Sequence, residues 1–552
     1  MRSRLCLLAV FALALGFVET VHAQTAALDA IVDKAIVRER ETVKALTNYS
    51  PLVETYIQHL SLHPQLGTVP SDDRYFLGKI DLKKGITPES LLQEEGGGIG
   101  SGIKGAFSSV FSMKYLPEGF SQMMYVDARR FDRSHYTFTY VQREFLGDVR
   151  CVVFDVKPKP GTQSAKFQGR IWIEDEDNNL VRFNGTYGQS SASKMYFHFD
   201  SWRENMTAGF WFPAYVYVEE SDLEYSVLGR KLRFKGQTRI WGYNPSPATS
   251  QSEMTAVRVD ASTRDSVDNV EGTSPVRNQR AWQRLAEENT VKRLQKGSLL
   301  APAGQVTDVL ETVITNLEVT NNLDIQPPVR ARIMLTTPLE SYTIGHTIVL
   351  SRGLVDVLPD EASLAMVLAH ELAHITLGHR VDTKFAFNDR MLFDDQQTFR
   401  IFSAKRDKKE EEAANKKAEE LLRNSPYKDK LANAGLFLRA LDERAGKLQQ
   451  LLNAHMGNFM ARGSKIERMP ELMKSAPKLE TDSTKQVAAL PLGGRLRVNA
   501  WNNAVELMKA EPVTLLSARE KMPFELTPVF LNLTRQKPAP APRTVSTTTT
   551  RK

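Results

Sequence analysis

Hydrophobic and polar positions in the first half of the chain follow a period of two residues. Apolar and polar side chains alternate in six stretches, over residues 136–140, 149–156, 168–174, 195–202, 215–218 and 232–243. Such alternation is typical of strands with one buried face. A helical pattern over 26–47 precedes them, and turn residues separate them. We therefore predict a β-rich module over residues 24–243, built as an antiparallel open sheet or half-barrel.

A helical period dominates the second half. Residues 244–280 are rich in Ser, Thr, Pro and Asp, which predicts a linker. Beyond it the pattern predicts helices at 281–294, 306–317, 361–378, 407–423 and 427–461, and strands at 331–335 and 343–350. The sequence thus predicts an α+β chain in which a mainly helical domain with a small sheet, residues 281–535, follows the β module. Residues 536–552 are of low complexity and are predicted to form a disordered tail.

The first 23 residues have the pattern of a signal peptide. Arg2 and Arg4 precede an apolar run over 5–18, and Val21 and Ala23 are small residues at the positions that a signal peptidase reads. The run is shorter than the roughly 20 apolar residues of a membrane-spanning helix. We expect an exported protein, periplasmic or secreted, with no membrane span after cleavage.

Composition narrows the class of protein only slightly. Lys and Arg total 72 against 65 Asp and Glu, so the formal charge is +7 in 552 residues. This small excess is spread along the chain, which argues against a nucleic-acid partner. Cys6 leaves with the signal peptide and Cys151 then has no intramolecular partner. Stability must therefore come from apolar cores or a bound metal.

The most specific motif is His370-Glu371-Leu372-Ala373-His374, within the predicted helix 361–378. Two histidines four residues apart lie one turn apart on the same side of a helix, so both imidazoles can reach one metal ion. Glu371 is rotated about 100° from His370 by the same geometry. It is therefore placed beside the metal, where a carboxylate can take a proton from a water molecule.

A catalytic zinc held by two imidazoles needs a third protein ligand. The metzincin pattern places a histidine six residues after the second ligand, where this chain has Arg380. That class is excluded. His379 lies about 140° round the helix from His374, so we expect it to pack at the helix end. The third ligand should then be a carboxylate from another helix.

Helical register distinguishes the glutamates at 410–412. Glu411 shares a face with the small residues Ala414 and Ala418, whereas Glu412 shares one with Lys416. This pattern favours Glu411 as the third ligand. The alternative is that the run forms only a solvated, charged helix face.

The stretch LPDEASLAMVLAHELAHITLGH, preceded by GHTIVLSRGLVDV and followed by EEAANKKAEELL, resembles peptidase family M48. This zinc metallopeptidase family holds the CaaX prenyl endoproteases and a bacterial heat-shock membrane protease. The resemblance implies a gluzincin-type domain, with one zinc ion held by His370, His374 and Glu411 and with Glu371 as the general base. Asn415 stands where the family has Asp. A His-Pro pair with a following Arg, present in many relatives, is not found, although His455 could substitute for it.

The leading hypothesis is a zinc-dependent metalloendopeptidase that acts on unfolded or misassembled exported proteins, in envelope protein quality control. The predicted strand 343–350 could bind the substrate as an added strand. The alternative is a client- or lipid-binding protein, with the β module as the binding site and an inactive or structural metal domain. A chaperone-like protease is a third possibility. The sequence reveals neither the natural substrate, the oligomeric state nor the group that stabilises the transition state.

Overall fold

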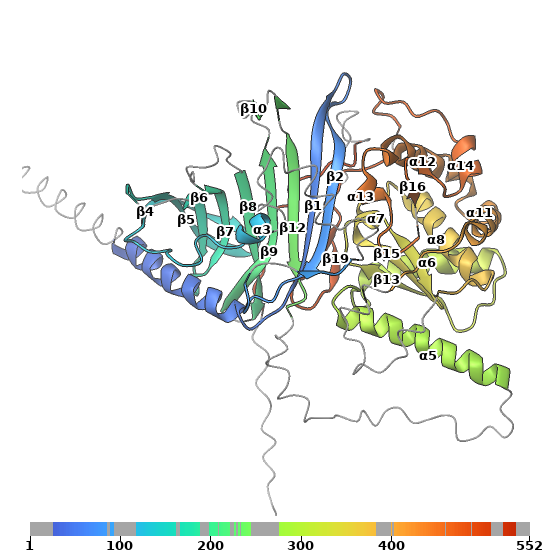
Figure 1. The fold of residues 1–552 in the computed structure, drawn as a ribbon, viewed down its shortest axis with the longest axis horizontal. Helices are drawn as coiled ribbons and strands as arrows, with labels where there is room; N and C mark the ends of the chain where they lie inside the picture. The colour runs from blue at the N-terminus through green and yellow to red at the C-terminus, as the bar shows by residue number, and fades with distance from the viewer. Residues whose placement is uncertain are drawn as a thin grey trace, which may run out of the picture.

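A ten-stranded antiparallel sheet forms the N-terminal part of the protein in the computed structural model (Figure 1). Its strand order is β3-β2-β1-β12-β9-β8-β7-β6-β5-β4. The strands are β1 Leu52–His63, β2 Gly67–Lys79, β3 Glu89–Ser90, β4 Tyr136–Leu146, β5 Val149–Pro158, β6 Phe167–Glu174, β7 Leu180–Tyr187, β8 His198–Thr207, β9 Phe210–Glu220 and β12 Phe234–Trp241. The short β10 Ser226–Val227 and β11 Arg230–Lys231 pair separately. The predicted antiparallel β module is confirmed.

The structure describes residues 26–85, 89–92, 118–161, 166–187, 198–207, 209–220, 226–227, 230–231, 233–243, 275–381, 399, 402–458, 460–486, 488–508 and 523–536. The predicted signal peptide, most of the predicted linker and the tail beyond residue 536 lie outside these ranges. Within them, no helix is both long and apolar enough to span a bilayer.

The six predicted strands correspond to β4, β5, β6, β8, β9 and β12, but the sequence pattern missed β1, β2 and β7. Strand β1 is buried along its first seven residues, and both Glu54 and Gln58 are among its buried side chains. A strand that is covered on both faces does not alternate between apolar and polar residues. Apolar and polar residues therefore do not alternate in β1, which explains why the sequence pattern missed this strand.

Both faces of the sheet are covered. A helix over 26–46 packs Val32 and Ile36 against a core that includes Phe154 and Phe183. The C-terminal segment 523–536 covers the opposite face.

Segment 523–536 lies against the sheet through both apolar and polar contacts. Val529 and Leu533 belong to the core on this face, and Arg535 Nη2 lies 2.7 Å from Glu174 Oε2. Gln58 donates from Nε2 to the carbonyl of Phe524. The segment also contacts the helical part, because Thr527 donates to the carbonyl of Leu492 and Phe524 packs on Phe437. The predicted end of the peptidase domain at residue 535 stays a prediction.

The second part of the chain is mainly helical, with a three-stranded sheet of order β13-β15-β14. Its helices include α5 Pro275–Lys296, α6 Gln305–Thr320, α7 Arg352–Val357, α8 Glu361–Thr376, α11 Lys408–Arg423, α12 Leu431–Ala445, α13 Gln449–Leu452 and α14 Pro470–Ser475, and its main strands are β13 Arg330–Met334, β14 Ser341–Ile344 and β15 Thr347–Ser351. Helix α5 begins inside the predicted linker. Two further hairpins, β16 Ala461–Arg462 with β17 Lys465–Ile466 and β18 Leu496–Val498 with β19 Val505–Leu507, complete this part.

Two predicted elements of this part differ in the structure. The predicted strand 343–350 is a hairpin, in which β14 is the edge strand and β15 lies in the centre. The predicted helix 427–461 is divided into α12 and α13 and ends at Leu452. Beyond that point Glu340 accepts hydrogen bonds from the backbone N–H groups of His455, Met456 and Gly457. A helix would have directed those N–H groups to its own carbonyls. His455 therefore lies outside any helix, and its ring packs on Tyr75 at 4.8 Å.

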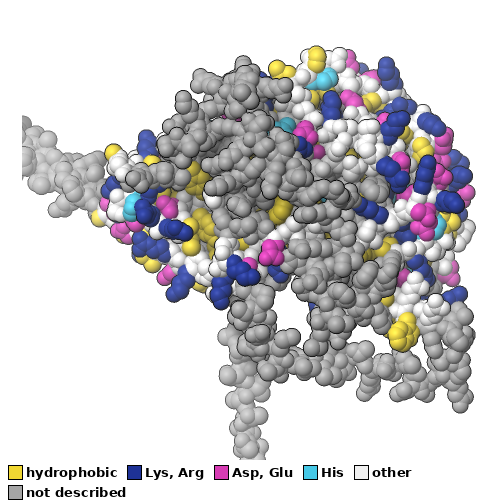
Figure 2. All heavy atoms as spheres, in the orientation of Figure 1, with side chains coloured by type: hydrophobic (Ala, Val, Ile, Leu, Met, Phe, Trp, Pro, Cys, Tyr) yellow, Lys and Arg dark blue, Asp and Glu magenta, His cyan; other side chains and the backbone are white. Residues whose placement is uncertain are grey.

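Carboxylates of the buried strands β1 and β2 join the large sheet to the helical part. Glu54 accepts a hydrogen bond from Thr337 Oγ1 at 2.8 Å and one from Arg352 Nη2 at 3.2 Å. Asp73 accepts hydrogen bonds from the backbone N–H groups of Gln450 and Leu451 at 2.9 and 2.8 Å. On the face shown in Figure 2, basic and acidic side chains are interspersed over the helical part.

The buried Asp73 should make the stability of the protein depend on pH. Burial raises the pKa of Asp73 to about 6, although its hydrogen bonds oppose this shift. The folded protein therefore holds this proton more tightly than the unfolded chain does, and the contribution of Asp73 falls as the pH rises. Between about pH 4 and pH 6 we expect the free energy of unfolding to fall by roughly 3 kcal/mol relative to Asp73→Asn. Urea denaturation at several pH values measures this, with Asp429→Asn, at an exposed aspartate of the helical part, as the control. Parallel pH profiles for wild type and Asp73→Asn would contradict the expectation.

Candidate metal centre

Helix α8 carries the two histidines through the middle of the helical part. Asp360 begins the helix by accepting a hydrogen bond from the N–H of Ser363 at 2.8 Å. Every residue from Met366 to His374 is buried, because α8 contacts α6, α11, α12 and β14. The packing on all sides holds His370 and His374 in place, and neither residue is exposed to solvent.

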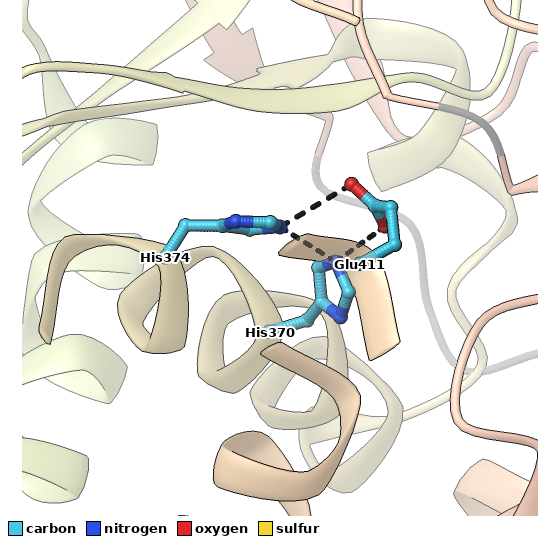
Figure 3. Close-up of side chains that lie close together, drawn as sticks. All are labelled: His370, His374 and Glu411. Carbon is cyan, nitrogen blue, oxygen red and sulfur yellow. Dashed lines mark hydrogen bonds and ion pairs between the residues drawn. The ribbon is translucent and has the colours of Figure 1, made fainter. Parts of the chain in front are cut away.

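The structure brings His370, His374 and Glu411 together (Figure 3). Helix α11 supplies Glu411, whose two carboxylate oxygens lie 3.2 Å from His370 Nε2 and 3.4 Å from His374 Nε2. The two Nε2 atoms are 3.1 Å apart. All three ligand atoms lie within 4.8 Å of one another. Three donor groups therefore converge on one point.

The electrostatics of the three residues suit a cation. Burial lowers the pKa of His374 to about 4, so its imidazole is neutral at pH 7. Burial opposes ionisation of Glu411, yet hydrogen bonds from the two histidines and the charge of Arg468 lower the pKa of that carboxyl group below its usual range. Neutral imidazoles and an ionised carboxylate are the protonation states that bind a metal ion. Two nitrogens and one oxygen form the donor set of a catalytic zinc site, so these residues fit zinc.

Glu371 lies in a buried network of its own. Its Oε1 atom accepts a hydrogen bond from Ser341 Oγ at 2.7 Å and one from Arg468 Nη2 at 3.3 Å. Arg468 Nη1 also donates to Ser341 Oγ at 2.5 Å. Among the described residues, nothing hydrogen-bonds to the buried Oε2 atom of Glu371. One oxygen is thus fixed and the other is available to a water molecule.

Sequence reasoning missed Ser341 and Arg468. Both are fully buried at the site, and Arg468 lies in an irregular segment between β17 and α14. The contacts of Arg468 with Ser341 and Glu371 span 127 and 97 residues. No local spacing signals such a contact. The long separation explains why no residue could be predicted for the positive charge at this site.

Asn415 anchors the segment that carries Arg468. Its side-chain Nδ2 donates to the carbonyl of Glu467 at 3.1 Å, and its Oδ1 accepts from the N–H of Met469 at 3.0 Å. These two bonds hold the residues immediately before and after Arg468 in the chain. An amide can donate and accept at once, whereas an ionised aspartate can only accept. Asn415 therefore holds the segment that carries Arg468.

His379 contacts the second ring nitrogen of His374. The two Nδ1 atoms are 2.9 Å apart. A histidine that binds a metal through Nε2 carries a proton on Nδ1, and a partner for that proton orients the ring. His379 is thus placed as a positioning residue for His374, and not as a packing residue alone.

Replacing His379 should therefore weaken the metal site without removing a ligand. We expect His379→Ala to lower zinc affinity about tenfold. Competition with a chromogenic zinc chelator measures this affinity, and His135→Ala, in the turn before β4, is the control. Unchanged affinity in His379→Ala would show that the ring of His374 needs no such partner.

Comparisons with known proteins agree with this geometry. Residues 302–416 match the model of Peptidase family M48, and this range contains α8 and Glu411. This match assigns the segment 302–416, and not the whole chain, to peptidase family M48. No curated protein matches it. A solved structure of a DUF1329 family protein from Desulfovibrio piger ATCC 29098 is 12% identical in sequence. The match covers 42% of this chain and 98% of that chain, with a TM-score of only 0.21.

Proposed function

We propose that the protein is a zinc-dependent metalloendopeptidase of the gluzincin type, which acts on unfolded or misassembled exported proteins. The observation that carries this proposal is the convergence of His370, His374 and Glu411 on one point, with Glu371 one residue along the same helix. Family membership supports a polypeptide substrate. The exported location rests on the signal-peptide pattern of residues 1–23.

Each residue has a distinct part in the proposed reaction. His370, His374 and Glu411 would hold a zinc ion, which when bound would supply a Lewis acid that lowers the pKa of water and polarises the scissile carbonyl. Glu371 takes the proton of the attacking water at Oε2 and returns it to the leaving amine. Arg468 and Ser341 hold the other carboxylate oxygen, Oε1, and so orient Glu371 for this transfer.

The edge of β14 is the proposed binding site for an extended substrate. Strand β14 is an edge of the small sheet, and Ser341 on this strand contacts the general base directly. A polypeptide that adds to a sheet edge is held through its backbone, so varied side chains are tolerated. An unfolded protein offers such extended segments, whereas a folded one does not.

The metal content of the mature chain tests this proposal. Protein purified without added metal is expected to contain about one zinc ion per chain, as a catalytic site of three protein ligands requires. It should degrade a permanently unfolded substrate such as reduced, alkylated casein. Removal of the metal by a chelator should stop degradation, and added zinc should restore it. A chain that binds no zinc, or whose activity survives metal removal, is not a zinc peptidase.

A further inference from the structure

Arg406 is a buried arginine beside β14, just before helix α11. Its side chain is 2% exposed, and its Nη2 atom donates to Thr343 Oγ1 at 2.8 Å. In the described part of the chain, Nε and Nη1 make no hydrogen bond. Glu410 Oε2 lies 3.7 Å from Nη1, too far for a hydrogen bond. A buried guanidinium with two unused donors is costly unless an anion binds it.

The position of Arg406 relates it to the proposed reaction. Ser341 and Thr343 are two residues apart on β14, so their side chains point to the same face of the sheet. On that face Ser341 contacts Glu371, and Thr343 contacts Arg406. Two strand residues span roughly 7 Å. Arg406 therefore lies beside the proposed substrate site, about two strand residues away from the general base Glu371.

The register of β14 defines which substrate residue would meet Arg406. Ser351 donates its N–H to the carbonyl of Glu340, whereas the carbonyl of Ser341 accepts from Asn458 on the outer side. Backbone groups alternate in direction along a strand, so those of Thr343 also point outward. The part of the edge left for a substrate is therefore at Thr343. An antiparallel substrate would place there a residue that precedes the cleaved bond.

We propose that Arg406 selects substrates with an aspartate or glutamate one or two residues before the cleaved bond. The substrate carboxylate would accept a charge-assisted hydrogen bond from Nε or Nη1. Thr343 holds the third nitrogen and orients the group for this contact. This inference rests on the proposed peptidase function and names the substrate class of the same site.

Cleavage of matched peptides tests the inference. Fluorogenic peptides would carry Glu, or Gln at the same place, at each of the two positions before the cleaved bond. We expect wild type to favour one Glu peptide over its Gln partner by about tenfold in kcat/KM. Arg406→Gln should lose this ratio and Arg406→Lys should keep part of it. The control Lys408→Gln, which removes a 69% exposed charge from the first turn of α11, should keep all of it. Melting temperature and zinc content establish that each variant is folded and loaded.

A binding experiment separates this inference from the peptidase proposal. Fluorescein-labelled versions of the same peptides would be titrated with Glu371→Ala, with and without Arg406→Gln. Tighter binding of the Glu peptide that disappears with Arg406→Gln supports the inference, whether or not wild type cleaves either peptide. Equal binding and equal cleavage of the Glu and Gln peptides would overturn it while leaving the peptidase proposal intact. A Glu preference that survives Arg406→Gln would also overturn it.

Discussion

Replacing Glu371 with glutamine is expected to abolish peptide cleavage while the protein keeps its zinc. Glutamine has nearly the same shape, and its oxygen can still accept the hydrogen bond from Ser341. It cannot take a proton from water, so the reaction loses its general base. A loss of about 10²–10⁴-fold in kcat is the usual size of this contribution.

Degradation of unfolded casein and the zinc content, measured on the same preparation, check this expectation. The control is Glu412→Gln, on the exposed side of α11, where the side chain is 63% exposed. That variant should cleave as wild type does. Undiminished cleavage by Glu371→Gln would exclude Glu371 as the base and leave the proposed mechanism without one.

The second large effect is expected from Glu411→Ala, which removes the carboxylate that faces both histidines. The remaining pair, His370 and His374, gives a zinc ion only two protein ligands. Structural zinc sites of four ligands bind with roughly 10–16 kcal/mol in total, so the loss of one ligand should weaken binding by a hundredfold or more. The purified variant should therefore contain little zinc and show no activity.

The zinc-to-protein ratio of Glu411→Ala, beside that of Glu412→Ala, measures this effect. A secondary effect should appear without any metal. The folded protein depresses the pKa of Glu411, so this carboxylate stabilises the metal-free fold above the ordinary pKa of a glutamate, and the contribution is lost as the pH falls. Full zinc occupancy in Glu411→Ala would mean that another group is the third ligand.

The sequence could predict those site residues whose positions depend only on the local pattern of one helix. The spacing of His370 and His374 and their helix are local properties, and the register of Glu411 on α11 is local as well. A short pattern could therefore place these three residues. Local alternation also predicted six strands of the large sheet, β4, β5, β6, β8, β9 and β12.

The rest of the site depends on contacts between distant segments. Arg468 and Ser341 meet Glu371 only through the fold. The backbone near residue 455 is held in the same way, since Glu340, more than 100 residues earlier, accepts hydrogen bonds from its N–H groups. A prediction from neighbouring residues cannot include a hydrogen-bond acceptor that comes from a distant part of the chain.

The segment 523–536 has a consequence for the architecture of the protein. The large sheet is built from strands between residues 52 and 241, and segment 523–536 covers part of one of its faces. The helical part lies between these two pieces in the sequence. A fragment that ends at residue 243 would lack Val529 and Leu533 and would expose the face that they cover. A well-packed fragment of the sheet therefore needs segment 523–536 as well as residues 26–243.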